Sequence, residues 1–277
     1  SDIRSGVIRR VATDGTTTPV DLRRTGDEHG RHVTPSVLAP AGLAVGSDGS
    51  LFVADRSGNR VCAVAPDGSV RVVAGGANGY RDGESTEAQF RHPLDVAFAP
   101  DGACYVADTG NNRIRRIASD GSVTTVAGSI YDYGDGRGAD ARFRQPAAID
   151  VDGEGICYVA DTGNNAVRRV TPDGAVVTLA GAPPGGDGDG AGLGVGLRWP
   201  IGIAIGAGGV VWIADHGNRA LRRIDLAGES STCLRLEGLS WPVSVALRAD
   251  ETLVVSGVAW HDLNTSEACL MVVRCTQ

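Results

Sequence analysis

The sequence predicts an all-β protein, a single β-propeller domain of four-stranded blades over residues 1–277. Three observations support this prediction. One segment recurs along the chain, each copy holds four short runs of alternating apolar or β-branched residues, and Asp-Gly pairs separate these runs. In addition, 40 of the 277 residues are glycine and no segment shows the period of a helix, which suits short strands joined by tight turns.

The copies open at a proline, and their order along the chain is Pro40, Pro93, Pro146, Pro200 and Pro242. The second copy reads PLDVAFAPDGACYVADTGNNRIRRIASDGSVTTVAG, the first aligns with it in the same register, and the pattern returns in the third. We name the four runs of each copy strands a to d. Alternating runs joined by Asp-Gly form antiparallel hairpins, so each copy predicts one four-stranded sheet. Such a sheet buries both faces only by packing against its neighbours, as blades do around an axis.

Five copies predict five blades. The N-terminal segment GVIRRVATDGTTTPV matches strands c and d, whereas the last copy holds strands a and b and one further strand, ACLMVVRC. Strands from both termini are therefore expected to share the blade that closes the ring. This count leaves one strand over, and a six-bladed ring with an irregular closing blade is the alternative.

The segment YVADTGNNRIRRI and the pattern DGxxxxAxFRxP before a blade resemble sequences of the NHL-repeat family. The resemblance extends from Ile8 to about Leu226. The resemblance implies the propeller fold but no single function, since members serve as enzymes, RNA readers, sensor domains and scaffolds. Zinc-dependent lyases of the family hold the metal with histidines directly after blade-opening prolines. Those positions here are Ala41, Leu94, Ala147, Ile201 and Val243, so that activity is not carried over.

Composition excludes several function classes. All 26 basic residues are arginine, which excludes Schiff-base catalysis and a P-loop lysine. The net charge of −7 opposes a phosphate backbone, so no nucleic-acid partner is expected. No apolar run reaches membrane-spanning length and no leader opens the chain, so we expect no membrane partner and a cytoplasmic monomer. Its cysteines should be reduced, with Cys104 and Cys157 buried at the same position of strand b.

Strand direction alternates within a blade, so the b/c turns and the long d/a spacers share one face, where we expect the site. Side chains that recur in every copy are predicted to hold the turns and spacers. In the b/c turn they are Asp55, Asp108, Asp161 and Asp215, with Asn59, Asn111, Asn164 and Asn218. Arginine pairs in strand c, such as Arg115-Arg116, predict salt bridges between blades.

Departures from the repeat predict the site itself. The residue before the opening proline differs from copy to copy, being Ala39, His92, Gln145, Trp199 and Trp241 in turn. Four residues after the opening proline the other copies have alanine, and the third copy has Asp150. We expect one pocket at the channel mouth on this face, lined by aromatic and polar side chains. The predicted catalytic residues are His216, Asp95, Asp150 and His92. The predicted substrate-binding residues are Arg56, Trp199, Trp241, Ser244, Trp260 and His261.

This set indicates general acid–base chemistry by a small-molecule lyase, hydrolase or isomerase. His216 or His92 would act as the base with Asp95 or Asp150 as its partner, and Arg56 would hold an anionic substrate. No cofactor is predicted, and a divalent metal bound by converging histidines is an unsupported alternative. Two further alternatives stay open. The tryptophans plug the channel and the polar groups satisfy loops, or the same face binds a protein or peptide without catalysis.

Overall fold

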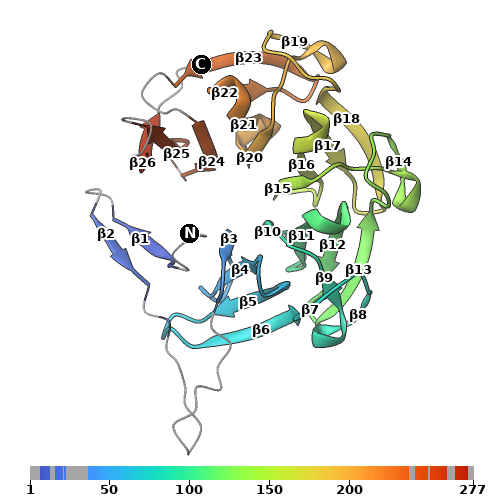
Figure 1. Cartoon of the computed structure of the whole chain (residues 1–277), viewed down its shortest axis with the longest axis vertical. Helices are drawn as coiled ribbons and strands as arrows, with labels where there is room; N and C mark the ends of the chain where they lie inside the picture. Colours follow the sequence, from blue (N-terminus) through green and yellow to red (C-terminus); the bar gives the residue numbers. More distant parts are fainter. Residues whose placement is uncertain are drawn as a thin grey trace, which may run out of the picture. The chain divides into compact units, whose positions relative to one another are not determined.

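The computed structural model describes residues 7–12, 16–20, 22, 37–236, 241–248, 250–260 and 266–273. In the described residues its strands form five antiparallel blade sheets, labelled in Figure 1, which confirms the predicted β-propeller fold class. Contacts divide the chain into two compact units, residues 1–126 and residues 127–277. Every helix in the described ranges is a single 3₁₀ turn, and none is long and apolar enough to cross a membrane.

The N-terminal unit holds one hairpin and two blades. The hairpin is β1 (Arg9–Val11) and β2 (Thr17–Pro19), as predicted from the Asp-Gly pair between them. The first blade is β3 (Pro40–Val45), β4 (Leu51–Asp55), β5 (Arg60–Val64) and β6 (Val70–Gly75). The second blade is β10 (Asp95–Phe98), β11 (Cys104–Asp108), β12 (Arg113–Ile117) and β13 (Ser122–Ala127). Ile8 packs with buried residues of the first blade, so the hairpin belongs to this core.

The C-terminal unit holds three blades. The third is β15 (Pro146–Val151), β16 (Cys157–Asp161), β17 (Ala166–Val170) and β18 (Ala175–Gly181). The fourth is β20 (Pro200–Ile205), β21 (Val211–Asp215), β22 (Ala220–Ile224) and β23 (Glu229–Arg235). The fifth is β24 (Trp241–Leu247), β25 (Leu253–Trp260) and β26 (Ser266–Val273). That strands from both termini share one blade, and that the chain is a single domain, stay predictions.

Three blades have five-stranded sheets where the sequence predicts four strands. The extra strands are β8 (Gly83–Glu84), β14 (Gly136–Arg137) and β19 (Gly190–Ala191). Each comes from a spacer and pairs with the outer strand of the blade that follows it in sequence, and β7 (Ala77–Asn78) pairs with β9 (Gln89–Phe90) within the first spacer. The spacers therefore cover outer sheet edges, which protects the unpaired backbone groups there.

Strand b is the core of each blade, and Val106, Val159 and Ile213 are fully buried on it. Cys62, Cys104 and Cys157 are free and buried, and burial raises the pKa of the Cys62 thiol to about 11. Cys233 is disulfide-bonded, so the expectation that all cysteines are reduced is wrong there. The cytoplasmic location stays a prediction.

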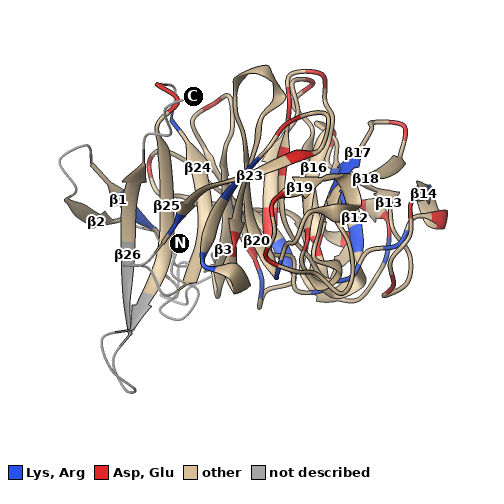
Figure 2. Ribbon diagram, turned by 90° about the horizontal axis from the view of Figure 1, so that it is seen from above, with Lys and Arg blue, Asp and Glu red and all other residues tan. Residues whose placement is uncertain are grey.

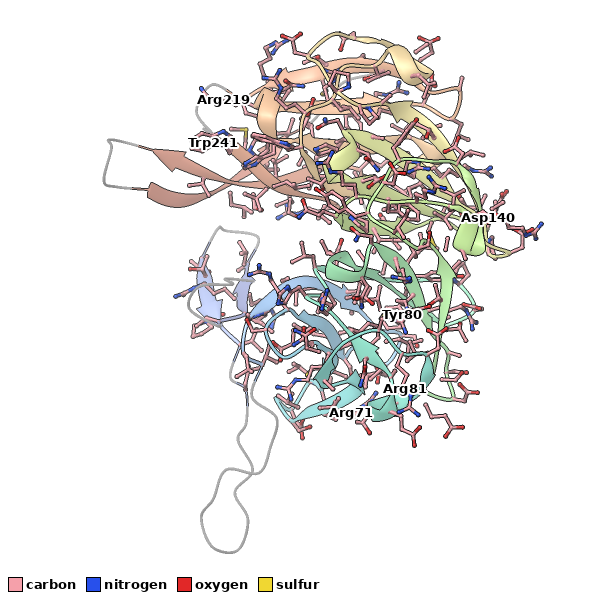
Figure 3. The ribbon with its side chains drawn as sticks, turned by 45° about the vertical axis from the view of Figure 1, so that its right-hand side comes forward. Arg71, Tyr80, Arg81, Asp140, Arg219 and Trp241 are labelled. Carbon is pink, nitrogen blue, oxygen red and sulfur yellow. The ribbon has the colours of Figure 1, made fainter. Side chains whose placement is uncertain are left out.

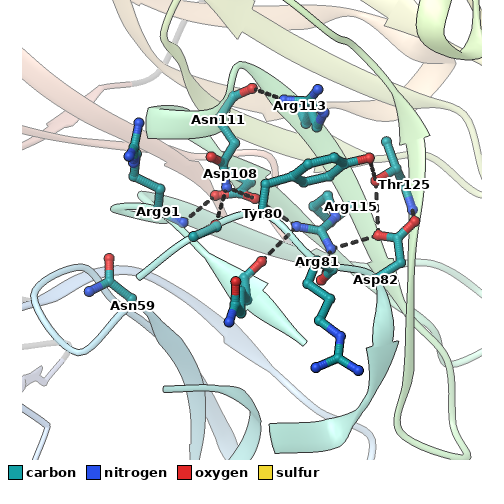
Figure 4. Close-up of polar contacts among 12 residues, drawn as sticks. Asn59, Tyr80, Arg81, Asp82, Arg91, Asp108, Asn111, Arg113, Arg115 and Thr125 are labelled. Atoms are coloured by element: carbon teal, nitrogen blue, oxygen red, sulfur yellow. Dashed lines mark hydrogen bonds and ion pairs between the residues drawn. The ribbon is translucent and has the colours of Figure 1, made fainter. Parts of the chain in front are cut away.

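A buried arginine in strand c ties each spacer to its own blade. Arginines on β12 and β17 are blue in Figure 2, and the side chain of Tyr80 on the spacer is labelled in Figure 3. Arg115 donates to Asp108 at 2.8 Å and to Asp82 of the spacer at 2.7 Å (Figure 4). Its guanidinium also lies 5.2 Å from the ring of Tyr80 and 5.0 Å from that of Phe90. These salt bridges join groups of one blade, so the predicted pairing between blades is wrong for Arg115.

The third blade repeats this clamp and the fourth weakens it. Arg168 donates to Asp161 and to Asp135 of its spacer, both at 2.8 Å. The corresponding Arg222 lies 3.8 Å from Asp215. Burial raises the pKa of Asp161 to about 6, although Arg168 opposes the rise. Recurrence of the clamp in three blades marks it as a structural element.

Candidate functional site

In each unit, the b/c turn and the end of the spacer lie at the same end of a blade. In the second blade, Asp108 accepts a hydrogen bond from the backbone N–H of Arg91 at 2.8 Å. In the fourth, Asp215 accepts one from the N–H of Arg198, also at 2.8 Å. The recurring aspartates thus hold the turns as predicted, and the spacers are anchored through backbone groups of these arginines.

In the first four blades, whose b/c turns are described, each of these turns ends in a left-handed residue. These residues are Asn59, Asn112, Asn165 and Arg219, with φ between 50° and 55°. Asn59 accepts the N–H of His92 at 3.0 Å, and Asn165 accepts that of Trp199 at 2.8 Å, so the asparagine holds the residue before the next opening proline. Asn59 therefore corresponds to Asn112 and Asn165, which corrects its predicted equivalence with Asn111.

Arg219 departs from this rule. Its φ is 51°, a conformation that costs about 1 kcal/mol for a residue other than glycine or asparagine. A guanidinium has no acceptor, so Arg219 cannot make the bond that Asn59 and Asn165 make in their turns. Its guanidinium carbon instead lies 5.4 Å from the ring centre of Trp241 (Figure 3). This strained conformation and the lost bond make Arg219 a candidate functional residue.

His216 occupies the position of Thr162 in the preceding blade. Thr162 donates its hydroxyl to the carbonyl of Pro200 at 2.6 Å, and His216 Nδ1 lies 2.9 Å from the carbonyl of Pro242. A carbonyl only accepts, so Nδ1 carries a hydrogen, and in the uncharged form of the ring the lone pair lies on Nε2. The imidazole is stacked on Trp241, with ring centres 6.1 Å apart and planes at 27°.

Trp199 and Ser244 lie at the same end of the fourth and fifth blades. Trp199 is 58% exposed and directly follows Arg198, whose N–H bonds Asp215. Ser244 is exposed on β24, and a Cβ at Gly202 of β20 would come within 2.7 Å of the Ser244 Cα. The C-terminal unit thus brings four predicted site residues to this end, which we call the turn face: Trp199, His216, Trp241 and Ser244.

The N-terminal unit brings three other predicted residues to the same end of its own blades. Arg56 and His92 are exposed, and the N–H of His92 is bonded to Asn59 of the turn that contains Arg56. Asp95 is half-buried two residues after the opening proline, and its Oδ1 accepts the N–H of Val96 at 2.9 Å. That all these residues line one pocket with those of the C-terminal unit stays a prediction.

Asp150 lies near the opposite end of its strand. It is four residues after Pro146, so the rise of a strand places it roughly 13 Å from the turn face. Its carboxylate accepts the N–H of Val151 at 2.9 Å and that of Ile205 in the fourth blade at 2.8 Å. Burial raises the pKa of this carboxyl, and both backbone bonds oppose the rise. The structure therefore does not bring Asp150 to His216, because its carboxylate joins two blades instead.

Two predicted residues are placed only in part. Trp260 ends β25, and its side chain lies outside the described residues, as does the whole of His261. Across the side chains that are described, no three His, Cys, Asp or Glu gather closely enough to hold a metal ion. The atom of the turn face that could serve as a ligand or a base is His216 Nε2.

Arg219 is a candidate site residue that was not predicted from the sequence. Comparing the b/c turns by their last residue, rather than by any asparagine within them, would have shown an arginine where three turns have asparagine. That departure resembles those that singled out His92 and His216.

Comparison with known proteins finds one NHL repeat in this chain and solved structures of similar fold. Residues 90–117 match the family model described as NHL repeat. Protein SUPPRESSOR OF QUENCHING 1, chloroplastic, of Arabidopsis thaliana is 32% identical over 188 residues, which cover 62% of this chain and 18% of the relative. Teneurin-m of Drosophila melanogaster is 29% identical over 224 residues, 72% of this chain and 8% of the relative. This chain spans less than a fifth of the length of either relative.

A solved structure of similar fold is a catalytically inactive variant of virginiamycin B lyase from Staphylococcus aureus with quinupristin. It is 18% identical, its TM-score is 0.62, and the match covers 92% of this chain and 71% of the lyase. At this identity the likeness shows the fold alone.

Proposed function

We propose that this chain, an NHL-repeat β-propeller, binds a small anionic molecule at the turn face of its fourth and fifth blades and uses His216 as a general base on it. One observation carries the proposal. The hydrogen bond from His216 Nδ1 to the carbonyl of Pro242 orients the ring and leaves the Nε2 lone pair available beside Trp241.

The neighbouring groups suit a flat ligand that carries a negative charge. Trp241 supplies an aromatic surface for stacking. The guanidinium of Arg219 would pair with a carboxylate or phosphate lying against that surface. His216 Nε2 would then accept a proton from the ligand or from a water beside it. This is the first step of an elimination, an isomerisation or a hydrolysis without a covalent intermediate. The lyase of similar fold supports the proposal because the same architecture serves lyase chemistry in that protein.

The test is the substitution His216→Thr. Threonine occupies this position in the third blade, where Thr162 bonds the next proline carbonyl at 2.6 Å, so the variant keeps the bond between blades and loses the imidazole. The full chain is first screened against aromatic and aliphatic carboxylates by saturation-transfer NMR and for their turnover. We expect H216T to bind a turned-over carboxylate within a few-fold of wild type and to lose roughly 100-fold or more in rate. Trp241→Ala should weaken binding. Turnover by H216T at the wild-type rate, or a wild type that binds none of these carboxylates, contradicts the proposal.

A second candidate is docking of a peptide at the same face, and the 58% exposure of Trp199 favours it. Exposed tryptophans are frequent anchors of protein interfaces. The matched variant is Trp199→Gln, because Gln145 precedes the opening proline of the third blade. Peptides selected by phage display against the wild type should lose at least tenfold in affinity for W199Q and none for H216T. Equal binding to W199Q would exclude this candidate.

A further inference from the structure

A cleft lies at the other end of the third and fourth blades, away from the turn face. It has a volume of about 900 Å³ and is bordered by the a/b turns of both blades, the c/d turn of the fourth and strand β18. Leu179, Ile205 and Leu226 form apolar parts of its wall, and Tyr158 and Arg169 form polar ones. This volume suits a small organic ligand.

Missing side chains in one turn open the cleft. The a/b turn of the fourth blade reads Gly206-Ala207-Gly208-Gly209, where the second blade has Ala99-Pro100-Asp101-Gly102. Gly208 thus replaces Asp101, and no atom lies within 4 Å of the place where its Cβ would be. This departure from the repeat thus lies in a turn that borders the cleft.

Arg169 departs from the repeat in its bonding. Its counterpart in the second blade, Arg116, forms a salt bridge with Asp101 at 2.7 Å. Arg169 is half-buried on β17, and no carboxylate of the described residues lies within salt-bridge distance of it. It pairs across the strands with Tyr158, which pairs in turn with Asp150, whose carboxylate bonds the fourth blade. This row of side chains thus faces the fourth blade across the cleft.

A half-buried guanidinium without a carboxylate partner is a strong site for a carboxylate, which it binds through two parallel hydrogen bonds. The Tyr158 phenol lies between it and Asp152, and its pKa is raised by burial and by Asp152 although Arg169 lowers it, so at neutral pH the phenol keeps its hydrogen. Asp152 and Glu154 also border the cleft and oppose negative charge there, so the single cation Arg169 favours a ligand with one carboxylate over a ligand with two. Asp152 Oδ1 is engaged by the N–H groups of its own turn, at 2.9 Å from Glu154 and from Ile156.

We infer that this cleft binds a small monocarboxylate with an aliphatic body. The carboxylate pairs with Arg169 and accepts from Tyr158, and the apolar part packs on Leu179, Ile205 and Leu226. This inference is independent of the function proposed for the turn face, because it uses other residues at the opposite end of the blades.

The experiment titrates 4-methylpentanoate into the folded full chain and follows the backbone amide signals of Gly206, Gly208 and Gly209. The matched neutral probe is 4-methylpentanamide. We expect the carboxylate to shift these signals with a dissociation constant of about 1 mM, and the amide to bind at least tenfold more weakly. Arg169→Gln should lower the affinity for the carboxylate at least tenfold. Arg223→Gln removes the corresponding arginine of the fourth blade, which does not line the cleft, and should leave the affinity unchanged.

Three results would overturn the inference. They are unshifted glycine signals, equal affinity for the acid and the amide, and a folded R169Q that binds as the wild type does. The comparison of acid with amide uses only wild-type protein, so it decides the matter even if R169Q does not fold. His216→Thr should leave this binding unchanged, which separates the cleft from the turn face.

Discussion

The turns after β16 and β21 share one backbone and differ in their side chains. Asn165 and Arg219 have φ values of 52° and 51°, and Thr162 and His216 both bond the carbonyl of the next opening proline. The fold thus requires a donor and a left-handed residue, and threonine and asparagine meet both needs. The fold does not require the imidazole of His216 or the guanidinium of Arg219 in the fourth blade. The proposed function therefore assigns recognition and chemistry to these two groups.

The largest effect should come from the clamps of these two blades. Arg168→Met leaves the Asp161 carboxyl buried without its cation and should cost about 3–5 kcal/mol in the free energy of unfolding. Arg222→Met should cost about half as much, because Arg222 lies 3.8 Å from Asp215, whereas Arg168 lies 2.8 Å from Asp161. Urea unfolding at constant m measures both losses. Equal losses would mean that the two clamps do not differ in strength.

The first of these losses should depend on pH. Burial already raises the pKa of Asp161 to about 6 against the opposing effect of Arg168, so the pKa rises further without it. Folded R168M then holds a proton that the unfolded chain releases above about pH 4, so its stability falls as the pH rises. The loss relative to wild type should be greater at pH 8 than at pH 5.

Placing the unusual arginine in the regular turn should cost less. Asn165→Arg loses the bond from Trp199 N–H at 2.8 Å and the bond to the Pro184 carbonyl at 2.9 Å. It also places a long side chain at φ 52°, so we expect a loss of about 1–2 kcal/mol by urea unfolding. Asn165→Gly keeps the conformation and loses the bonds, which separates the two causes. An unchanged stability of N165R would show that Arg219 carries no strain.

The reverse exchange should stabilise the protein. Arg219→Asn restores the residue of the other turns and relieves the left-handed arginine, so we expect a gain of about 0.5–1 kcal/mol by thermal unfolding. The same variant should bind carboxylates at the turn face more weakly, because their cationic partner is gone. A gain in stability with unchanged binding would remove Arg219 from the proposed site.

The smallest effect on stability is expected from His216→Thr. The hydroxyl of the introduced threonine can donate to the Pro242 carbonyl, as the Thr162 hydroxyl donates to that of Pro200. The free energy of unfolding should therefore stay within about 0.5 kcal/mol of wild type. His216→Ala leaves that carbonyl without its donor and should cost about 1 kcal/mol. If both variants lose the same amount in urea unfolding, the Nδ1 bond does not hold the ring.

Much of the fold could be predicted because its signals are local. The Asp-Gly pairs at Asp101-Gly102 and Asp120-Gly121 sit in turns between alternating runs, and the repeat places the same strands in each copy. The spacer strands were missed because β8, β14 and β19 are two residues long and pair through backbone groups, which leave no side-chain pattern. The site was predicted less completely, since a departure from a repeat marks a position and not the direction of its side chain.

Asp150 and His216 show where this limit lies. Both were recognised from the sequence alone, together with the repeat, the five blades and the face of the turns, because each follows from residues close together in the chain. Only the tertiary structure showed that Asp150 bonds Ile205 of the next blade, that His216 Nδ1 bonds the Pro242 carbonyl, and that Arg169 borders a cleft. The bonds of Asp150 and His216 depend on partners in the adjacent blade, and the difference at Arg169 is visible only beside the Arg116–Asp101 ion pair of the second blade. The hydrogen bonds and the burial at such contacts are set by how the blades pack.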